Sequence, residues 1–448
     1  MKKYRFLIFM LLILLVLPVL STPALALDDP APEATAALVV DATHDMVLYD
    51  LNAHERRYPA SITKVMTALL TLEAVERGEL SLDQMITATE AIHTDMVPGG
   101  STQNIQTGET MSLRDALCCA LIPSANESAN FLAIVVAGDI PSFVAMMNQR
   151  AAELGMTDTH FANPHGLHRD DHYTTAWDIY LLAREAMTHQ VFREIVATAD
   201  YTVPATNLSE ERHFYNTNAL LTPSRYSSYL YSPAIGIKTG TTSEAGQCLL
   251  SAAERDGRTL YCVVLGAQMA AQEDGSYRQM QFYETVRLLE WGFTNFSIRT
   301  ILENSDPVAQ VEVTLSDTDH VLVRPEGSLF ALLPNDQDLS EFKATPELFA
   351  QSVEAPVEEG QVLGKITLTL NGEEYGSLDL VALNDVERSE LQYHIDRAEK
   401  FLDQLWVKVA AVALVVLILL LIILISVRRR RRRRRRSRSY GYSGRRRR

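Results

Sequence analysis

The sequence predicts an α/β (α+β) protein: an antiparallel sheet sandwiched by helices, a small all-β C-terminal domain and one C-terminal transmembrane helix. Short strand patterns occur at residues 37–51 and again at 247–267, with helical patterns between them. A sheet assembled from both ends of such a segment is antiparallel rather than doubly wound. Beyond residue 297 apolar and polar residues alternate, and residues 409–427 are apolar except for Ser426.

The main domain is predicted over residues 27–296. Two strands are expected at 37–42 and 46–51, around a polar turn. A helix is expected at 61–78, where apolar residues recur with helical spacing and Gly78 ends the pattern. Further helices are predicted at 113–121, 125–137, 140–154 and 278–292, and further strands at 247–254 and 258–267.

The four cysteines are expected to be small core residues. Cys118 and Cys119 are adjacent on a predicted helix, so their side chains diverge. The Asp256-Gly257 pair predicts a hairpin turn, and in that register Cys248 and Cys262 lie on opposite faces of the sheet. No disulfide is predicted.

A β-rich auxiliary domain is predicted over residues 297–384, with an Asn371-Gly372 hairpin turn. Its strands are expected at 311–315, 320–324, 365–370 and 375–381. Residues 385–408 follow as an amphipathic linker helix, because Leu391, Ile395 and Leu402 share one helical face.

The two ends of the chain predict export and anchoring. Residues 1–26 combine basic residues, a short apolar run and the Ala24-Leu25-Ala26 cleavage pattern of a signal peptide. As a helix, residues 409–427 would be about 28 Å long, which suits a membrane span. The Arg-rich segment 428–448 is a predicted cytoplasmic tail, because arginine beside a span stays in the cytoplasm. We therefore expect a single-pass protein of the cell membrane, with its main domain extracytoplasmic.

The charge balance argues against nucleic acid as a partner. The formal net charge is −15. Without the 18 basic residues of the two ends, 23 basic residues oppose 56 acidic ones, a net charge near −33 for residues 27–406. Such an acidic body does not favour a polyanion. The arginine tail could bind one in principle, but its place beside a span favours topology and contact with anionic lipids.

The segment Ser61-Ile62-Thr63-Lys64 is the first of three motifs that can carry chemistry. Its serine and lysine lie one helical turn apart on one face. A serine hydroxyl needs an adjacent base to become a good nucleophile, and a helix N-terminus favours a neutral lysine that can be this base. The spacing alone is weak, because a solvated helix face explains it equally well.

The second motif is Ser124-Ala125-Asn126. A serine hydroxyl here could pass a proton to a leaving nitrogen, and the Asn126 amide could hold a substrate carbonyl. Alternatively, Pro123 followed by Ser124 could simply begin a helix.

The third motif is Lys238-Thr239-Gly240-Thr241, at the entry to the second strand region. A lysine and hydroxyls on an edge strand can bind a terminal carboxylate, and Gly240 would let a substrate backbone approach closely. An ordinary polar loop is the alternative.

In this order the three motifs resemble those of the penicillin-binding-protein and serine β-lactamase superfamily. Within it the sequence is most similar to the low-molecular-weight penicillin-binding proteins of the D-alanyl-D-alanine carboxypeptidase family, over roughly residues 35–385. The resemblance implies a β-lactamase/transpeptidase-like fold. The family-specific segments are 58–64, 121–126, Asn163-Pro164-His165-Gly166-Leu167 and 236–240 through Ala245-Gly246.

The resemblance also implies roles for individual residues. The catalytic residues would be the acylated nucleophile Ser61, its base Lys64 and the proton relay Ser124. The substrate-binding residues would be Asn126, Lys238, Thr239, Gly240 and Thr241. The backbone N–H groups of Ser61 and Thr241 would form the oxyanion hole. Relatives often add an arginine near the last helix; Arg278 lies in that region, but its register is open and it is left out of the site.

The implied activity is that of a serine-type D-Ala-D-Ala carboxypeptidase, which removes the terminal D-Ala from peptidoglycan stem pentapeptides. The expected partners are these stem peptides, β-lactam antibiotics as covalent inhibitors and the membrane. No cofactor and no metal are expected.

Several alternatives stay open. A D,D-endopeptidase, a transpeptidase or a β-lactamase would use the same acyl-enzyme, although no Glu-x-x-Leu-Asn segment of the class A β-lactamase kind is found. A non-catalytic wall-binding or sensor module could have the same fold without using the three motifs for catalysis. A zinc hydrolase could use the cluster of His160, His165, His168, His172, Asp170 and Asp171, but Asn163, Pro164 and Gly166 break helical geometry there.

Overall fold

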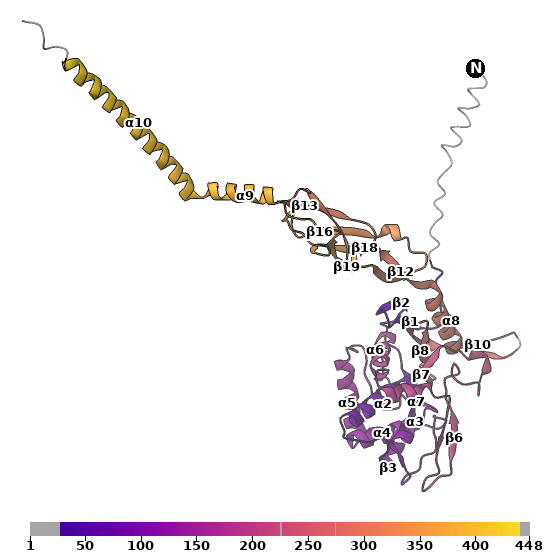
Figure 1. Cartoon of the computed structure of the whole chain (residues 1–448). Helices are drawn as coiled ribbons and strands as arrows, with labels where there is room; N and C mark the ends of the chain where they lie inside the picture. The colour runs from indigo at the N-terminus through magenta and orange to yellow at the C-terminus, as the bar shows by residue number, and fades with distance from the viewer. Residues whose placement is uncertain (1–26, 225, 274, 440–448) are drawn as a thin grey trace, which may run out of the picture. The chain divides into compact units, whose positions relative to one another are not determined.

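The computed structural model describes residues 27–224, 226–273 and 275–439 (Figure 1). The predicted signal peptide at 1–26 and the final residues of the arginine tail lie outside the described residues. By contacts the chain divides into two units. The first runs to Ile298 and includes the segment Leu332–Gln337, and the second holds Arg299–Ala331 and the chain from Asp338 onward.

The centre of the first unit is a five-stranded sheet in the order β2-β1-β9-β8-β7. Every neighbouring pair in it is antiparallel. The sheet is built from both ends of the segment, as predicted. Its strands are β1 (Ala36–Asp41), β2 (Met46–Leu51), β7 (Ala234–Thr242), β8 (Gly246–Arg255) and β9 (Arg258–Ala267).

Both faces of this sheet are covered by helices (Figure 1). Alternate residues of β9 pack into two cores because successive side chains of a strand point to opposite faces. Tyr261 and Val263 join the core shared with the helices of residues 64–197, whereas Leu260 and Val264 pack against α8 (Met280–Asn295). The predicted antiparallel sheet sandwiched by helices is confirmed.

Between the two halves of the sheet, the helices predicted at 113–121, 125–137 and 140–154 agree to within one residue, and the helix predicted at 61–78 needs one correction. Two further helices lie where the sequence predicts a helical pattern without bounds. The predicted helix at 61–78 begins as a 3-10 turn, Ala60–Thr63, and the α-helix α2 runs only from Lys64 to Glu76. The others are α3 (Leu113–Leu121), α4 (Asn126–Ala137), α5 (Ile140–Glu153), α6 (Ala176–Ala186) and α7 (Gln190–Ala197). Short hairpins that the sequence did not reveal join them: β3 (Met85–Thr87) with β4 (Thr110–Ser112), and β5 (Asp200–Val203) with β6 (Arg212–Tyr215). A third, β10 (Met269–Ala271) with β11 (Tyr277–Gln279), precedes α8.

The cysteine predictions hold. Asp256 and Gly257 both have positive φ, 51° and 78°, as a type I′ hairpin requires. Cys248, which lies at an irregularity of the β8–β9 register, and Cys262 belong to different cores, on opposite faces. All four thiols are free and buried. Burial raises the pKa of Cys248 to about 11 and that of Cys262 to about 12.

The second unit contains a six-stranded sheet in the order β16-β18-β19-β14-β13-β17. Asn371 and Gly372 form the tight turn between its longest strands, with φ of 51° and 90°. Four of these strands match the predicted ones, and β16 and β17 were not predicted. The strands are β13 (Ala309–Thr314), β14 (His320–Pro325), β16 (Lys343–Leu348), β17 (Ser352–Glu354), β18 (Val362–Leu370) and β19 (Glu373–Ala382).

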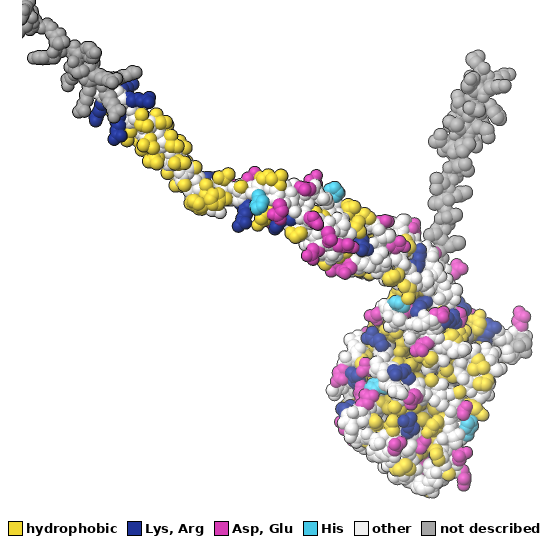
Figure 2. Space-filling view, viewed as in Figure 1, with side chains coloured by type: hydrophobic (Ala, Val, Ile, Leu, Met, Phe, Trp, Pro, Cys, Tyr) yellow, Lys and Arg dark blue, Asp and Glu magenta, His cyan; other side chains and the backbone are white. Residues whose placement is uncertain are grey.

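Two helices end the described chain. The helix α9 (Glu390–Asp403) exposes the apolar side chains Leu391, Ile395 and Leu402. The helix α10 (Leu405–Ser439) is long and apolar enough to cross a membrane from Leu405 to Arg431. Its surface is hydrophobic along most of its length and basic where the arginines begin (Figure 2).

Candidate active site

Ser61 lies in the 3-10 turn that leads into α2, and it is partly exposed. In a 3-10 helix residues three apart eclipse each other, so Ser61 and Lys64 are aligned more closely than in an α-helix. Ala60 has φ of +47°, a conformation that costs energy for a residue with a Cβ. Its carbonyl occupies the space that a side chain on Gly166 would need, only 1.9 Å from an ideal Cβ there. The turn is therefore held in a strained shape by its surroundings.

Thr63 also stabilises this 3-10 turn. Its hydroxyl donates to the carbonyl of Ala60 at 2.8 Å. The Nε2 of His172 lies 2.8 Å from the same hydroxyl oxygen, and its Nδ1 accepts from the N–H of Ala162 at 3.2 Å. Burial lowers the pKa of His172 to about 3, so the ring is neutral and serves as a bridge between two chain segments.

Lys64 is completely buried beside the nucleophile. Its Nζ lies 2.8 Å from Ser61 Oγ, 2.8 Å from Asn126 Oδ1 and 2.7 Å from the carbonyl oxygen of His165. Burial, and next the charge of Lys238, lower the pKa of Lys64 well below that of an ordinary lysine; Glu127 partly opposes this. Its surroundings therefore favour the neutral form of the amine.

The three contacts determine what a neutral Lys64 does. A neutral amine has two N–H bonds and one lone pair. The Asn126 and His165 oxygens can only accept, so they take the two N–H groups. The lone pair is then left for the Ser61 hydroxyl, which donates to it. This is the arrangement in which an amine removes the proton of a serine.

Ser124 and Asn126 stand at the start of α4. Asn126 is buried, and its backbone N–H donates to the carbonyl of Ser101 at 2.9 Å. Ser124 is also buried and has φ of +69°. Such left-handed conformations of non-glycine residues gather at functional sites. Of the second motif, the structure thus brings Asn126 into direct contact with Lys64.

The third motif lies on β7, which is the edge strand of the sheet. Lys238 is buried, with its Nζ donating to the carbonyl of Thr239 at 3.1 Å. A Cβ on Gly240 would lie 2.9 Å from the carbonyl oxygen of Pro59 and 3.1 Å from the nitrogen of Ser61. The absence of a side chain at Gly240 therefore allows the strand to pack against the turn at Ser61, in addition to the predicted approach of a substrate backbone. Thr241 is exposed on the same strand.

Two further residues of the site were missed by sequence reasoning. The hydroxyl of Thr217 lies 2.6 Å from that of Thr239. Glu127 is buried and accepts from the Thr102 hydroxyl at 2.7 Å and from the Gln103 N–H at 2.6 Å. Glu127 directly follows Asn126, but nothing in the sequence alone indicates that its charge acts on Lys64.

The histidine alternative is not supported by the contacts of its members. The ring of His165 is buried and its Nδ1 accepts from the N–H of Leu167 at 3.1 Å. His172 is used at Thr63, as described above. Burial, and next the charge of Lys64, lower the pKa of His165 well below its usual range. The contacts of both rings are with neighbouring chain segments, which indicates structural roles.

Two hollows border the site. The larger, about 720 Å³, is lined by Asn163, His165 and Thr241 together with the segment 95–100. The smaller, about 480 Å³, reaches Asn126 and Glu127. Their walls include Thr241 and Asn126 but not Ser61 itself. Arg278 lies elsewhere: it stacks on Tyr283, with its Cζ 4.5 Å from the ring centre, and lines a separate hollow, so leaving it out of the site agrees with the structure.

Ser61 is partly exposed, Lys64 is buried beside it, and Lys238 lies on the adjacent edge strand. This arrangement is typical of serine hydrolases that work without a histidine base. Comparison with known proteins narrows this class. Residues 24–269 match the family described as D-alanyl-D-alanine carboxypeptidase. Residues 296–388 match the C-terminal domain of penicillin-binding protein 5. The chain belongs to the D-alanyl-D-alanine carboxypeptidase family.

Individual relatives agree with this assignment. The D-alanyl-D-alanine carboxypeptidase DacC of Escherichia coli is 30% identical over 366 residues, which cover 80% of this chain and 86% of the relative. The structure of penicillin-binding protein 5 from Haemophilus influenzae is 28% identical, covers 80% of this chain and 99% of its own, and has a TM-score of 0.57. The ampicillin-bound penicillin-binding protein D2 of Listeria monocytogenes is 30% identical, covers 59% of this chain and 100% of its own, and has a TM-score of 0.50. The predicted family, fold and enzyme class, a serine carboxypeptidase, are confirmed.

Proposed function

We propose that this protein removes the terminal D-Ala of peptidoglycan stem pentapeptides through an acyl-enzyme on Ser61. The observation that carries the proposal is the buried amine of Lys64, 2.8 Å from the Ser61 hydroxyl and held by two carbonyl oxygens. Membership of the carboxypeptidase family supports the substrate.

The reaction begins when the neutral Lys64 takes the proton of Ser61. The Ser61 oxygen attacks the carbonyl carbon of the D-Ala–D-Ala bond, and the negative charge that develops is stabilised by the backbone N–H groups of Ser61 and Thr241. The contact of β7 with the nucleophile turn at Gly240 supports this pairing. The C–N bond then breaks, and the proton reaches the departing D-Ala through Ser124. Water hydrolyses the ester and restores the Ser61 hydroxyl.

The substrate is held along β7. As an edge strand, β7 has backbone groups that an extended peptide can pair with. The terminal carboxylate binds at Lys238 and Thr239, and Asn126 orients a substrate carbonyl. The positive charge of Lys238 then has two effects, since it attracts the carboxylate and also keeps Lys64 neutral.

The same chemistry makes β-lactam antibiotics covalent inhibitors of this protein. The ampicillin-bound structure of a relative supports this proposal. Because the sequence lacks the deacylating Glu-x-x-Leu-Asn segment, we expect the penicilloyl ester on Ser61 to persist.

The activity is tested by measuring free D-Ala after the full chain, in detergent, is incubated with a pentapeptide that ends in D-Ala–D-Ala. Ser61→Ala should abolish D-Ala release, whereas Ser81→Ala, at an exposed position, should retain it. Release of D-Ala only when an amine acceptor is added would instead make the protein a transpeptidase. No release under either condition from a folded chain would contradict the proposal.

We also propose that α10 spans the cell membrane once, with the catalytic unit outside and the arginine tail in the cytoplasm. The apolar surface of α10 and the arginines that follow it support this topology.

A further inference from the structure

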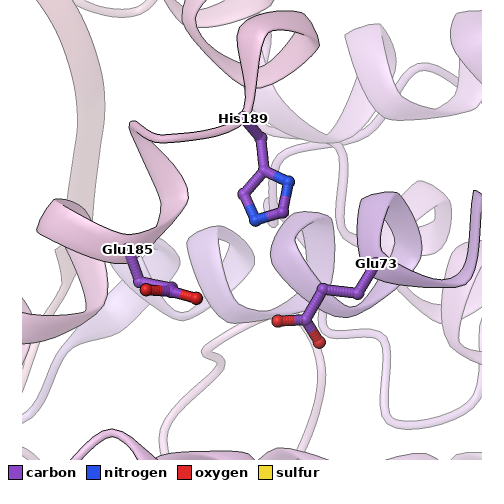
Figure 3. Close-up of side chains that lie close together, drawn as sticks. All are labelled: Glu73, Glu185 and His189. Atoms are coloured by element: carbon purple, nitrogen blue, oxygen red, sulfur yellow. The ribbon is translucent and has the colours of Figure 1, made fainter. Parts of the chain in front are cut away.

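A second cluster of ionisable side chains lies near the far end of α2 from Lys64. Glu73 lies near the C-terminal end of α2, Glu185 near that of α6, and His189 in the turn between α6 and α7. One ligand atom of each residue lies within 4.8 Å of the others. Figure 3 shows the three side chains, from separate segments, converging on one space.

The ring of His189 is the observation that points to a ligand. Its side chain is 9% exposed, and its Nδ1 lies 2.7 Å from Glu76 Oε1. A carboxylate at that distance only accepts, so Nδ1 carries a proton, and in the neutral ring Nε2 has the lone pair that a metal ion needs. This Nε2 is buried and has no hydrogen-bond partner among the described residues. The two carboxylates and Nε2 thus face one space, in which Arg150 pairs with both carboxylates while Nε2 has no partner among the described residues.

The surroundings of the cluster resemble the outer shell of a metal site. A metal-bound histidine usually donates its second N–H to a carboxylate, as His189 does to Glu76. Ligating carboxylates are in turn hydrogen-bonded. Arg150 donates to Oε1 of Glu73 at 2.9 Å and to Oε1 of Glu185 at 2.6 Å, which leaves Oε2 of each carboxylate for another partner.

The charge balance leaves room for a divalent cation. Arg150 contributes one positive charge. The carboxylates around it and His189 belong to Glu73, Glu76, Glu153 and Glu185. An ion pair with Arg150 therefore does not neutralise the cluster.

We propose that Glu73, Glu185 and His189 bind a Zn²⁺ ion, with water as the fourth ligand and Glu76 as the residue that orients His189. One imidazole nitrogen and two carboxylate oxygens are a ligand set that zinc accepts. Tetrahedral coordination would place the ligand atoms about 3.4 Å apart. They lie within 4.8 Å of one another here, so the side chains would draw together when the ion binds. The ion would connect the turn between α6 and α7 to α2, the helix that begins at Lys64.

The test is equilibrium dialysis of the full chain, freed of metal with a chelator and then exposed to Zn²⁺, with zinc counted by atomic emission. We expect one zinc per chain and a Tm that rises with zinc. His189→Gln should lower the affinity at least tenfold and remove the rise in Tm. His394→Gln, an exposed histidine on α9, should behave like the wild type.

Two additional variants keep the test decisive. Glu76→Gln leaves all three ligands in place and should weaken zinc binding 10- to 100-fold. It tests the proposal independently if His189→Gln does not fold. Ser61→Ala should bind zinc normally, because the site does not depend on the proposed catalytic activity. The proposal would be overturned if the wild type bound no more zinc than His189→Gln does. It would also be overturned if neither His189→Gln nor Glu76→Gln changed the affinity of the chain for zinc.

Discussion

At the scale of single residues, the site contains a buried lysine, Lys64, whose pKa lies well below its usual range. An amine buried without water favours its neutral form, and Lys238 adds electrostatic repulsion to the effect of burial. The Asn126 and His165 oxygens accept from the two N–H groups of the neutral amine, which reduces the free-energy cost of burying it. Two residues with positive φ, Ala60 and Ser124, add local strain next to the reacting groups.

The pH dependence of acylation is predicted to follow Lys64. Because its folded pKa is depressed, the rate should stay high down to a pH far below the pKa of an ordinary lysine, and fall as the amine protonates. Lys238→Gln removes a neighbouring positive charge, raises the pKa of Lys64 and should move this acidic limb to higher pH. Glu127→Gln removes a negative charge and should move it to lower pH.

The measurement is the rate of labelled-penicillin incorporation between acidic and alkaline pH, for the wild type and both variants. Lys238 also belongs to the proposed substrate-binding residues, so Lys238→Gln should lower the maximum rate as well. The direction of the pH shift is read from the shape of the curve and does not depend on that loss. Shifts of both variants in the same direction would show that another group controls the rate.

The same depressed pKa has a consequence for stability. Between the folded and unfolded pKa values of Lys64 the unfolded chain binds more protons, so its contribution to stability rises with pH. Wild type should therefore gain more stability than Lys64→Met as the pH is raised from 7 toward the ordinary lysine pKa. Chemical denaturation at several pH values, followed for the first unit, would measure this; parallel curves would contradict it.

At the scale of elements, the site is the meeting of a 3-10 turn, the start of α4 and an edge strand. The closest approach is between β7 and the turn at Ser61, where only glycine fits. Gly240→Ala would place a methyl group 2.9 to 3.1 Å from backbone atoms of Pro59 and Ser61, so one of the two elements must shift. A displacement of about 1 Å at reacting atoms can cost on the order of a hundredfold in rate.

We therefore predict that Gly240→Ala lowers the acylation rate by about one hundredfold while the chain stays folded. Gly78→Ala is the matched control, because no atom lies within 4 Å of its Cβ and its φ of +74° strains only the end of α2. The control should lose about 1 kcal/mol of stability and keep its acylation rate. Equal rates in the two variants would mean that the contact at Gly240 is not needed.

The sequence predicts this architecture well where the pattern is local. The ranges of α3, α4, α5, β8 and β9 follow from periodicity, capping and an Asp-Gly turn, and the three motifs are brought together as the resemblance implies. It fails where the conformation depends on distant contacts. The α-helix begins at Lys64 rather than Ser61 because the turn at Ala60 and Thr63 is held by Gly166 and His172, which follow it by more than a hundred residues. Thr217 and Glu127 were missed for the same reason.

At the scale of the whole molecule, a folded catalytic unit and a second β-sheet unit precede a helix suited to a membrane. The central residues of α10 are all apolar and exposed, so only lipid or another apolar partner can cover them. Charged side chains at the middle of a span each cost about 2.5 to 3.5 kcal/mol. Their introduction should therefore weaken anchoring in proportion to their number.

Replacement of Leu414, Ile418 and Ile422 by Arg is predicted to release the protein from membranes. Alanine at the same three positions is the matched control and should stay bound, because the span remains uncharged. The fraction of each chain that floats with lipid vesicles after a high-salt wash measures the effect. Retention of the arginine variant at wild-type levels would place the anchor outside α10.

The measurement that tests the central claim most directly is mass spectrometry of the full chain after exposure to benzylpenicillin. We predict one stable adduct per chain, on the peptide that contains Ser61, and its loss in Ser61→Ala but not in Ser81→Ala. An adduct on another residue, or none from a folded chain, would show that Lys64 does not activate Ser61.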